Sequence, residues 1–241
     1  MSSWLAKFQA DFKLNFLDGN KWTWLLNGLK VTLQITFFAV LIGIVIGGII
    51  AVIRSVYEKN ADDMHGIKKG ILVALNAFAK VYLAVIRGTP VVVQLMIMYY
   101  IIFASSTNGQ PIAILAFGIN SGAYVAEIFR SGIMSIDNGQ FEAGRSLGFN
   151  FFQTMWYIIF PQALRNVLPA LANEFIVLLK ETSVAGYVSI VDLTRAGDMI
   201  RGRTFSPFMP LIAVAIIYLF MVIILTWLVE KLERRLRSDE R

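Results

Sequence analysis

The chain has 241 residues, of which 57% are hydrophobic, and its formal net charge is +6. This apolar share exceeds the roughly 45–50% that is typical of a soluble domain. The chain has no cysteine and a single histidine, His65, which argues against disulfides, thiolate catalysis and a metal site built from several histidines. Lys and Arg gather at the ends of apolar runs, so the positive charge indicates orientation in a membrane rather than nucleic-acid binding.

The first 24 residues form an N-terminal segment of their own. Large apolar side chains recur every three to four residues among charged ones at Trp4, Leu5, Phe8, Phe12 and Phe16. This spacing predicts an amphipathic helix lying in the membrane interface. An ordinary surface helix that packs on the protein would show the same spacing. The segment has no apolar core region and no small-residue cleavage site, so it is not expected to be a signal peptide.

Five apolar stretches predict an all-α integral membrane protein with about five transmembrane helices. A bilayer core of about 30 Å needs about 20 predominantly apolar residues in a helix. Within the apolar stretch 70–104, Pro90 predicts a break, with a tilted or interfacial helix to about Ile86 and a span after the proline. The expected spans cover 31–53, 90–104, 112–133, 162–180 and 208–229.

The first expected span contains Gly43 and Gly47, which offer a small-residue face for close helix packing. A polar loop from Arg54 to Lys69 is expected to follow it. An odd number of spans puts the two termini on opposite sides of the membrane. With the N-terminus outside, twelve Lys and Arg flank the spans inside and seven outside, which favours this orientation. The expected organisation is an amphipathic segment at 1–24, a transmembrane domain at 25–230 and a basic cytoplasmic tail at 231–241.

The segment between the third and fourth spans predicts two short helices on the cytoplasmic side. Asp137 followed three residues later by Gln140 is typical of a capped helix start. Gly148 fits the end of that helix, Asn150 can cap a second one, and Pro161 is expected to end it.

The first of these helices carries a candidate docking surface. Glu142 lies in the first turns, where the helix dipole favours an acid. Ala143, Gly144 and Leu147 are expected to form a small apolar face exposed to the cytosol. Such a face on a loop of a membrane protein is typical of a site where a soluble partner binds.

The complete pattern Glu-Ala-Gly-x3-Gly-x9-Ile-x-Phe-Pro, from Glu142 to Pro161, closely resembles the EAA loop of permease subunits of ATP-binding cassette importers. Ala is more usual in that family at the position of Gly144, and Leu at that of Phe160. The resemblance implies a type I importer permease fold with cytoplasmic coupling helices that seat in the ATPase subunit. The implied ATPase-coupling residues are Glu142, Ala143, Gly144, Leu147, Gly148 and Pro161.

Further motifs are similar to the polar amino acid branch of that family, the histidine, glutamine, arginine and cystine permeases. They are Gly28 to Leu33, Arg87-Gly88-Thr89-Pro90, Tyr124 to Arg130, Pro161 to Arg165 and Leu179 to Ser183. The resemblance covers roughly residues 25–230. It implies two ATPase subunits that hold ATP and Mg, a second permease subunit (identical or different), an extracytoplasmic solute-binding protein and a place in the bacterial cytoplasmic membrane.

Polar residues inside the expected spans are the candidates for a substrate path. A helix rises about 1.5 Å per residue, so Asn173 and Glu174 lie about 15–18 Å into the fourth span, close to the midplane. A carboxyl group at that depth either contacts substrate or is neutralised by a basic residue of a neighbouring helix. Further candidates are Gln94, which lines the path or joins helices, Tyr124 and Glu127, of which Glu127 is expected to pair with Arg130.

The outer end of the fourth span carries four polar residues in a row, Lys180, Glu181, Thr182 and Ser183. They form either an outer gate or, for Lys180 and Glu181, a simple charge pair at the interface. The following loop, 184–207, is expected to face the solute-binding protein.

The leading hypothesis is a permease subunit that moves polar amino acids by alternating access, driven by partner ATPases. The chain contains no Gly-x4-Gly-Lys-Ser/Thr loop, so it is not expected to hold ATP or to be an enzyme itself. The alternative is an ion-coupled secondary transporter of small polar solutes. That reading predicts inverted repeats with broken helices in matched halves, which the sequence does not show, and leaves the docking face unexplained.

Overall fold

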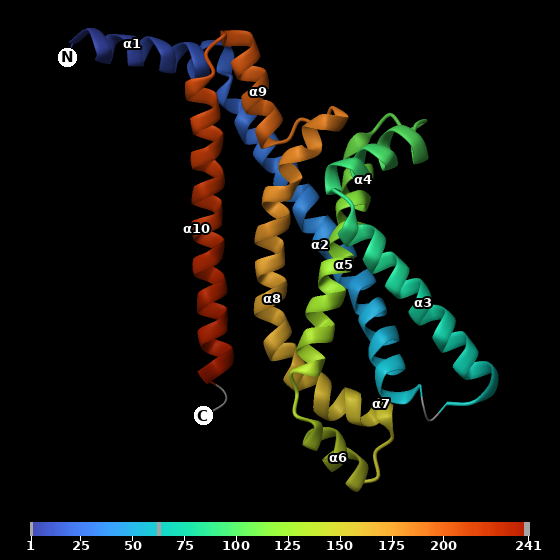
Figure 1. Ribbon diagram of the computed structural model, residues 1–241. Helices are drawn as coiled ribbons and strands as arrows, with labels where there is room; N and C mark the ends of the chain where they lie inside the picture. Colours follow the sequence, from blue (N-terminus) through green and yellow to red (C-terminus); the bar gives the residue numbers. More distant parts are fainter. Residues whose placement is uncertain (1, 62–63, 239–241) are drawn as a thin grey trace. The chain divides into compact units, whose positions relative to one another are not determined.

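The computed structural model describes residues 2–61 and 64–238, and this part of the chain is helical with short connections and no strand (Figure 1). The all-α prediction is confirmed. The long helices are α2 (Trp22–Asn60), α3 (Gly66–Gly88), α5 (Gly109–Met134), α8 (Phe160–Glu181) and α10 (Phe208–Ser238). The short ones are α1 (Ser2–Phe12), α4 (Val91–Ile97), α6 (Asn138–Ser146), α7 (Phe151–Thr154) and α9 (Leu193–Thr204).

Four helices in the described residues are long and apolar enough to cross a membrane, namely α2, α3, α5 and α10. The 22 residues of α8 would extend about 33 Å, which is also sufficient for a bilayer core. Glutamine, arginine, asparagine and glutamate side chains along α8 lower its hydropathy below that of the other four helices. The expected spans at 112–133, 162–180 and 208–229 therefore correspond to α5, α8 and α10.

In residues 70–104 the predicted helix to about Ile86 and the break before Pro90 are confirmed, but the span was assigned to the wrong side of the proline. The helix long enough to span lies before Pro90, as α3, whereas the segment after it forms only a short apolar helix over Val91–Ile102. Nothing in Gly66–Gly88 stops a helix, because Lys80 has a long side chain that a helix tolerates. The expected loop from Arg54 is also shorter than predicted, since α2 continues to Asn60. Residues 62 and 63 of that loop lie outside the described residues.

The chain forms two compact units. Unit 1 contains the residues up to Ala39, Val91–Phe117 and Ile176–Trp227. Unit 2 contains Val40–Pro90, Gly118–Phe175 and the residues from Leu228. Each of α2, α5, α8 and α10 contributes one part to each unit.

Unit 1 has a core in which α9 packs against the first parts of α2 and α10. Its buried residues are Phe16, Leu25, Leu193, Ala196, Ile200 and Val214. The start of α9 is tied to α2 because the Leu193 N–H donates to Thr32 Oγ1 at 3.1 Å. Residues 184–207 were expected to form a loop. Most of them are helical instead, in the end of the helical turns η5 (Thr182–Val188) and in α9.

Unit 2 is built around a close approach of α2 and α5. A Cβ atom at Gly47 would lie 2.7 Å from the Ala126 backbone nitrogen, and one at Gly43 would lie 2.9 Å from Ser121 Oγ. The predicted small-residue packing face is therefore confirmed. In addition, the Tyr82 hydroxyl of α3 donates to the Ile119 carbonyl at 2.6 Å, which fixes α3 beside α5.

Candidate functional site

The helix α6 begins and ends where the sequence predicts. The Asp137 side chain accepts from the Gly139 N–H at 2.6 Å, which makes it the N-cap. A capping box would also need the Gln140 side chain to accept a hydrogen bond from the Asp137 backbone N–H. Instead, the Gln140 side chain accepts a hydrogen bond from Gln162 at 3.3 Å. Gly148 ends the helix region with a φ of +80°, a conformation that favours glycine.

The second short helix, α7, starts with the full reciprocal cap between Asn150 and Gln153. The expectation that it ends at Pro161 was wrong. A wide helical turn, η4 (Met155–Ile159), continues α7 into α8, and Pro161 lies in the first turn of α8. The helical path thus continues through Pro161, with the wide turn of η4 directly before it.

The predicted apolar face of α6 is only partly as expected. Leu147 is 71% exposed and Ala143 is exposed as well, so these two residues form an open apolar patch. Gly144 is buried instead, because a residue next to Ala143 points about 100° away around the helix. A Cβ atom at Gly144 would lie 2.6 Å from both Thr154 Cγ2 and Oγ1, so this glycine lets α6 pack directly on α7.

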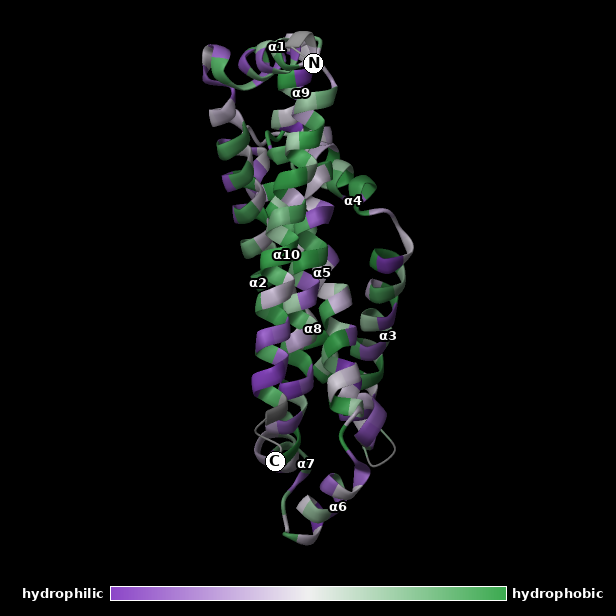
Figure 2. Ribbon diagram, turned by 90° about the vertical axis from the view of Figure 1, so that its left-hand side faces the viewer, coloured by the Kyte–Doolittle hydropathy of each residue, from purple (hydrophilic) through white to green (hydrophobic). Residues whose placement is uncertain are grey.

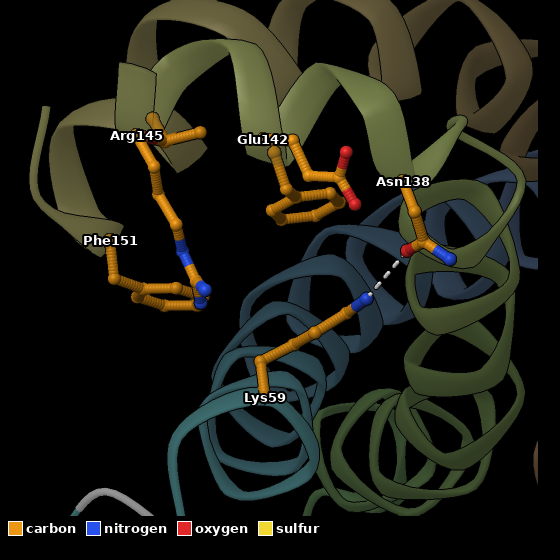
Figure 3. Close-up of a pocket in the computed structure, with 7 residues that line it drawn as sticks. Lys59, Asn138, Glu142, Arg145 and Phe151 are labelled. Carbon is orange, nitrogen blue, oxygen red and sulfur yellow. Dashed lines mark hydrogen bonds between the residues drawn. The ribbon is translucent and has the colours of Figure 1, made fainter. Parts of the chain in front are cut away.

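A polar pocket of about 240 Å³ lies between the end of α2, α6 and α7 (Figure 3). Lys59 joins α2 to α6, since its ammonium donates to Asn138 Oδ1 at 3.0 Å and lies 4.5 Å from the centre of the Phe141 ring. Glu142 and Arg145 line the same pocket. Sequence reasoning missed Lys59, because nothing in the sequence pairs the end of α2 with α6.

A second pocket, of about 450 Å³, is lined by α3, α5 and α8 within unit 2, and it contains three of the candidate path residues. Glu174 is only 9% exposed and accepts a hydrogen bond from the Ser121 hydroxyl at 2.9 Å. Tyr124 and Glu127 line the same pocket. The chain thus brings two carboxylates, from α5 and α8, to one hollow.

The two carboxylates of this pocket have different surroundings. Glu127 is paired with Arg130, whose Nε lies 3.1 Å from Glu127 Oε1, so the predicted ion pair is confirmed. Arg54 of α2 adds a second guanidinium, 4.0 Å from Glu127 Oε2. Arg87 also lines the pocket, with its guanidinium 5.8 Å from the centre of the Tyr124 ring. Arg54, Arg87 and Ser121 were not among the predicted site residues; the charges of the two arginines were the signal that could have found them.

The remaining candidates do not line this pocket. Asn173 is exposed beside a different hollow, which it shares with Pro169 and Glu233. Gln94 belongs to α4 in unit 1. In the described residues Lys180 and Glu181 form no ion pair, while Thr182 is buried and donates to the Leu179 carbonyl at 2.8 Å. The roles of these residues, and of Ser183, stay predictions.

Residues 67–238 match the family described as binding-protein-dependent transport system inner membrane component. The chain belongs to this family. The permease is 36% identical to the glutamine transport system permease protein GlnP of Escherichia coli K12, over 88% of its own length and 93% of that protein. It is 34% identical to a putative protein of the same name from Rickettsia typhi, over 88% and 92% of the two chains.

Solved structures agree with this assignment. The permease superimposes with a TM-score of 0.78 and 41% identity on a chain from the crystal structure of an amino acid ABC transporter with histidines, covering 91% of this chain and 98% of that one. An inward-facing MetNI methionine ABC transporter matches with a TM-score of 0.74 at 20% identity, over 88% and 95%, and this likeness concerns the fold alone. The predicted ABC importer permease is therefore confirmed, and the ion-coupled transporter alternative is wrong.

Proposed function

We propose that the permease moves polar amino acids with a cationic or zwitterionic form through the pocket that Glu174 lines. The buried carboxyl group of Glu174 carries this proposal, since ionisable groups inside spans are rare and mark substrate or ion pathways. Two relatives named as glutamine permeases and a structure of an amino acid transporter support the substrate class.

The charges that line the pocket favour one orientation of the bound substrate. Arg130 and Arg54 both lie beside Glu127, and Glu174 accepts a hydrogen bond from Ser121; within this proposal Glu174 contacts the substrate ammonium or guanidinium. Arg87 at the same pocket is suited to the substrate carboxylate. An acidic amino acid would bring a second negative charge to Glu174 and would be disfavoured.

The partners follow from the family and from the exposed patch on α6. We propose that two ATPase subunits, which hold ATP and Mg, bind at Ala143 and Leu147, and that the permease itself hydrolyses nothing. A second permease subunit, identical or different, completes the path through the bilayer, and an extracytoplasmic binding protein delivers the solute. The protein then lies in a bacterial cytoplasmic membrane with its N-terminus outside and its C-terminus inside, as the charge distribution favours.

Uptake by Glu174→Gln tests the proposal. The amide keeps an acceptor for Ser121 and removes the charge, so we expect uptake of arginine or histidine to fall by about tenfold or more. The measurement is ATP-driven uptake of labelled amino acids into proteoliposomes that contain the ATPase subunits and the binding protein. Glu230→Gln, the same change on the exposed part of α10, is the control and should transport normally.

Two further readouts make the result decisive. ATPase activity stimulated by the binding protein should persist in Glu174→Gln, which shows that the complex is assembled. Uptake unchanged from the wild type, or uptake of aspartate as fast as that of arginine by the wild type, would contradict the proposal.

A further inference from the structure

The N-terminal helix α1 leaves its apolar side uncovered. Trp4 is 65% exposed, Leu5 48%, Phe8 45% and Phe12 44%. Trp4 and Phe8 stack on each other with ring centres 5.6 Å apart, so the aromatic residues contact their own neighbours along the helix. Of the two sequence interpretations of this segment, a helix that packs on the protein would have buried this stripe, whereas a helix in the membrane interface leaves it free.

Although the stripe is exposed, the end of the segment is fixed firmly to unit 1. Asn15 is fully buried; its amide donates to Ser206 Oγ at 3.1 Å, and its carbonyl oxygen accepts from the Thr204 hydroxyl at 2.8 Å. Phe16, the next member of the same stripe, is buried in the unit 1 core. The stripe thus runs from open side chains at Trp4 to a core residue at Phe16.

Within unit 1, α1 lies crosswise to the first part of α10, at the end where α10 begins (Figure 1). The residue that holds Asn15, Ser206, is only two positions before the start of α10 at Phe208. From there α10 exposes apolar side chains along its length, including Phe208 at 70%, Ile216 at 59% and Phe220 at 64%. The exposed stripe of α1 therefore continues the exposed apolar surface of α10, at the end where α10 begins.

The charges of α1 suit the same position. Hydrophilic and hydrophobic residues alternate along α1 in Figure 2. Lys7 lies beside the apolar stripe at about 100° per residue, Lys13 directly follows the end of α1, and both side chains are exposed. Long lysine side chains in such positions extend to lipid phosphates while their stems cover apolar surface.

We propose that α1 is an in-plane lipid anchor. It lies at the boundary between headgroups and acyl chains, with Trp4, Phe8 and Phe12 among the acyl chains and both lysines at the phosphates. Asn15 fixes this anchor to the link between α9 and α10, so the membrane surface sets the position of α9 at that face of unit 1. The occupant of the exposed stripe is the bilayer and not a second protein.

Site-directed spin labelling tests the anchor, because the chain has no native cysteine to remove. Phe8→Cys places a label in the stripe and Lys7→Cys places one beside it on the polar side. Ile216→Cys, on the exposed side of α10, provides the value for a lipid-facing position. The complete permease, with the subunits that co-purify with it, is reconstituted in phosphatidylcholine and phosphatidylglycerol nanodiscs, and collision rates with oxygen and with a water-soluble nickel chelate are measured.

We expect the label at position 8 to resemble that at 216, with high oxygen and low nickel collision rates, and the label at position 7 to show at least a several-fold higher nickel rate. Equal and high nickel rates at 7 and 8 would place α1 in water and overturn the proposal. Low rates with both reagents at position 8 would show that another protein surface covers the stripe, which overturns it as well.

Discussion

At the residue scale, Asp192 shows how burial controls a charge. It is fully buried at the start of α9, outside the helices that are long enough to span a membrane, and it accepts backbone hydrogen bonds from Thr194 and Arg195, each at 3.0 Å. Burial raises the pKa of the Asp192 carboxyl group above its ordinary value, and the two backbone donors only partly oppose this.

The change in the protein's stability with pH should therefore depend in part on Asp192. A carboxyl group with a higher pKa in the folded state contributes its full stability below its ordinary pKa of about 3.9, and this contribution is lost as the pH rises towards the folded value. We expect the unfolding midpoint of the wild type to fall with rising pH relative to Asp192→Asn, whose side chain has no charge to lose. Scanning fluorimetry in detergent from about pH 4 to about pH 7 measures both curves.

The variant loses one accepted backbone hydrogen bond, so its curve should also be offset downward by about 0.5–1.5 kcal/mol at low pH. This offset does not depend on pH and is separable from the predicted slope. Parallel curves over the whole range would show that the charge of Asp192 does not affect folding.

At the element scale, the contact between α6 and α7 depends on Gly144, which has no side chain. The closest approach places Thr154 directly over Gly144, and both residues are buried. Alanine, the residue more usual in the family's loop, would have to displace Thr154. The glycine and the threonine are therefore a matched pair in this chain.

A double-mutant cycle tests this match. Gly144→Ala alone should destabilise the protein by about 1–3 kcal/mol, because the added methyl group overlaps Thr154. Combining it with Thr154→Ala should restore most of the loss, since the two overlapping atoms are removed. Thermal unfolding of the four proteins measures the coupling, and strictly additive effects would be evidence against direct packing.

Elements differ in how well the sequence alone predicts them. Helices with a cap or an uninterrupted apolar stretch were predicted best: α6 has nearly the predicted bounds, and α10 begins at Phe208 as predicted but continues beyond residue 229 to Ser238. The helix α9 was missed because its signals, an N-cap at Asp192 and buried residues at Ala196 and Ile200, lie among charged residues in what resembled a loop. The helix before Pro90 was predicted to about Ile86, but it was taken as tilted or interfacial, although α3 is long and apolar enough to span.

The site shows the same limit. Glu174 and Glu127 are polar residues within apolar stretches, which any hydropathy scan detects. Their partners Ser121 and Arg54 come from other helices, and only tertiary packing places them there. Gly144 was assigned to the exposed face because residue type alone does not show which side of α6 meets α7.

At the scale of the whole molecule, we propose that the exposed patch on α6 is where an ATPase subunit of the importer binds. Leu147 is 71% exposed at the C-cap of α6, where it forms an apolar patch with the exposed Ala143. An exposed apolar patch on a loop of a membrane protein is typical of a contact that another subunit buries.

Substitution of the exposed Leu147 should weaken assembly with the ATPase subunits without unfolding the permease. Leu147→Asp places a charge in the proposed contact, so we expect the ATPase subunits to bind about tenfold more weakly or worse. Ser146→Asp, next to it and also exposed, is the matched control and should retain them. Co-purification of the ATPase with each tagged variant gives the result, and equal recovery would exclude Leu147 from the contact.

The continuous helical path from α7 through η4 into α8 has a mechanical consequence. From Phe151 to Glu174 the described backbone contains no loop, so the segment that packs under α6 and the carboxyl group in the pocket belong to one stiff lever. A rotation applied at α7 would be transmitted along this helical path towards Glu174, and it would be reduced at the wide turn of η4 and at Pro169, which removes a hydrogen bond inside α8. Insertion or removal of one residue in that turn would change the angle at which the force arrives.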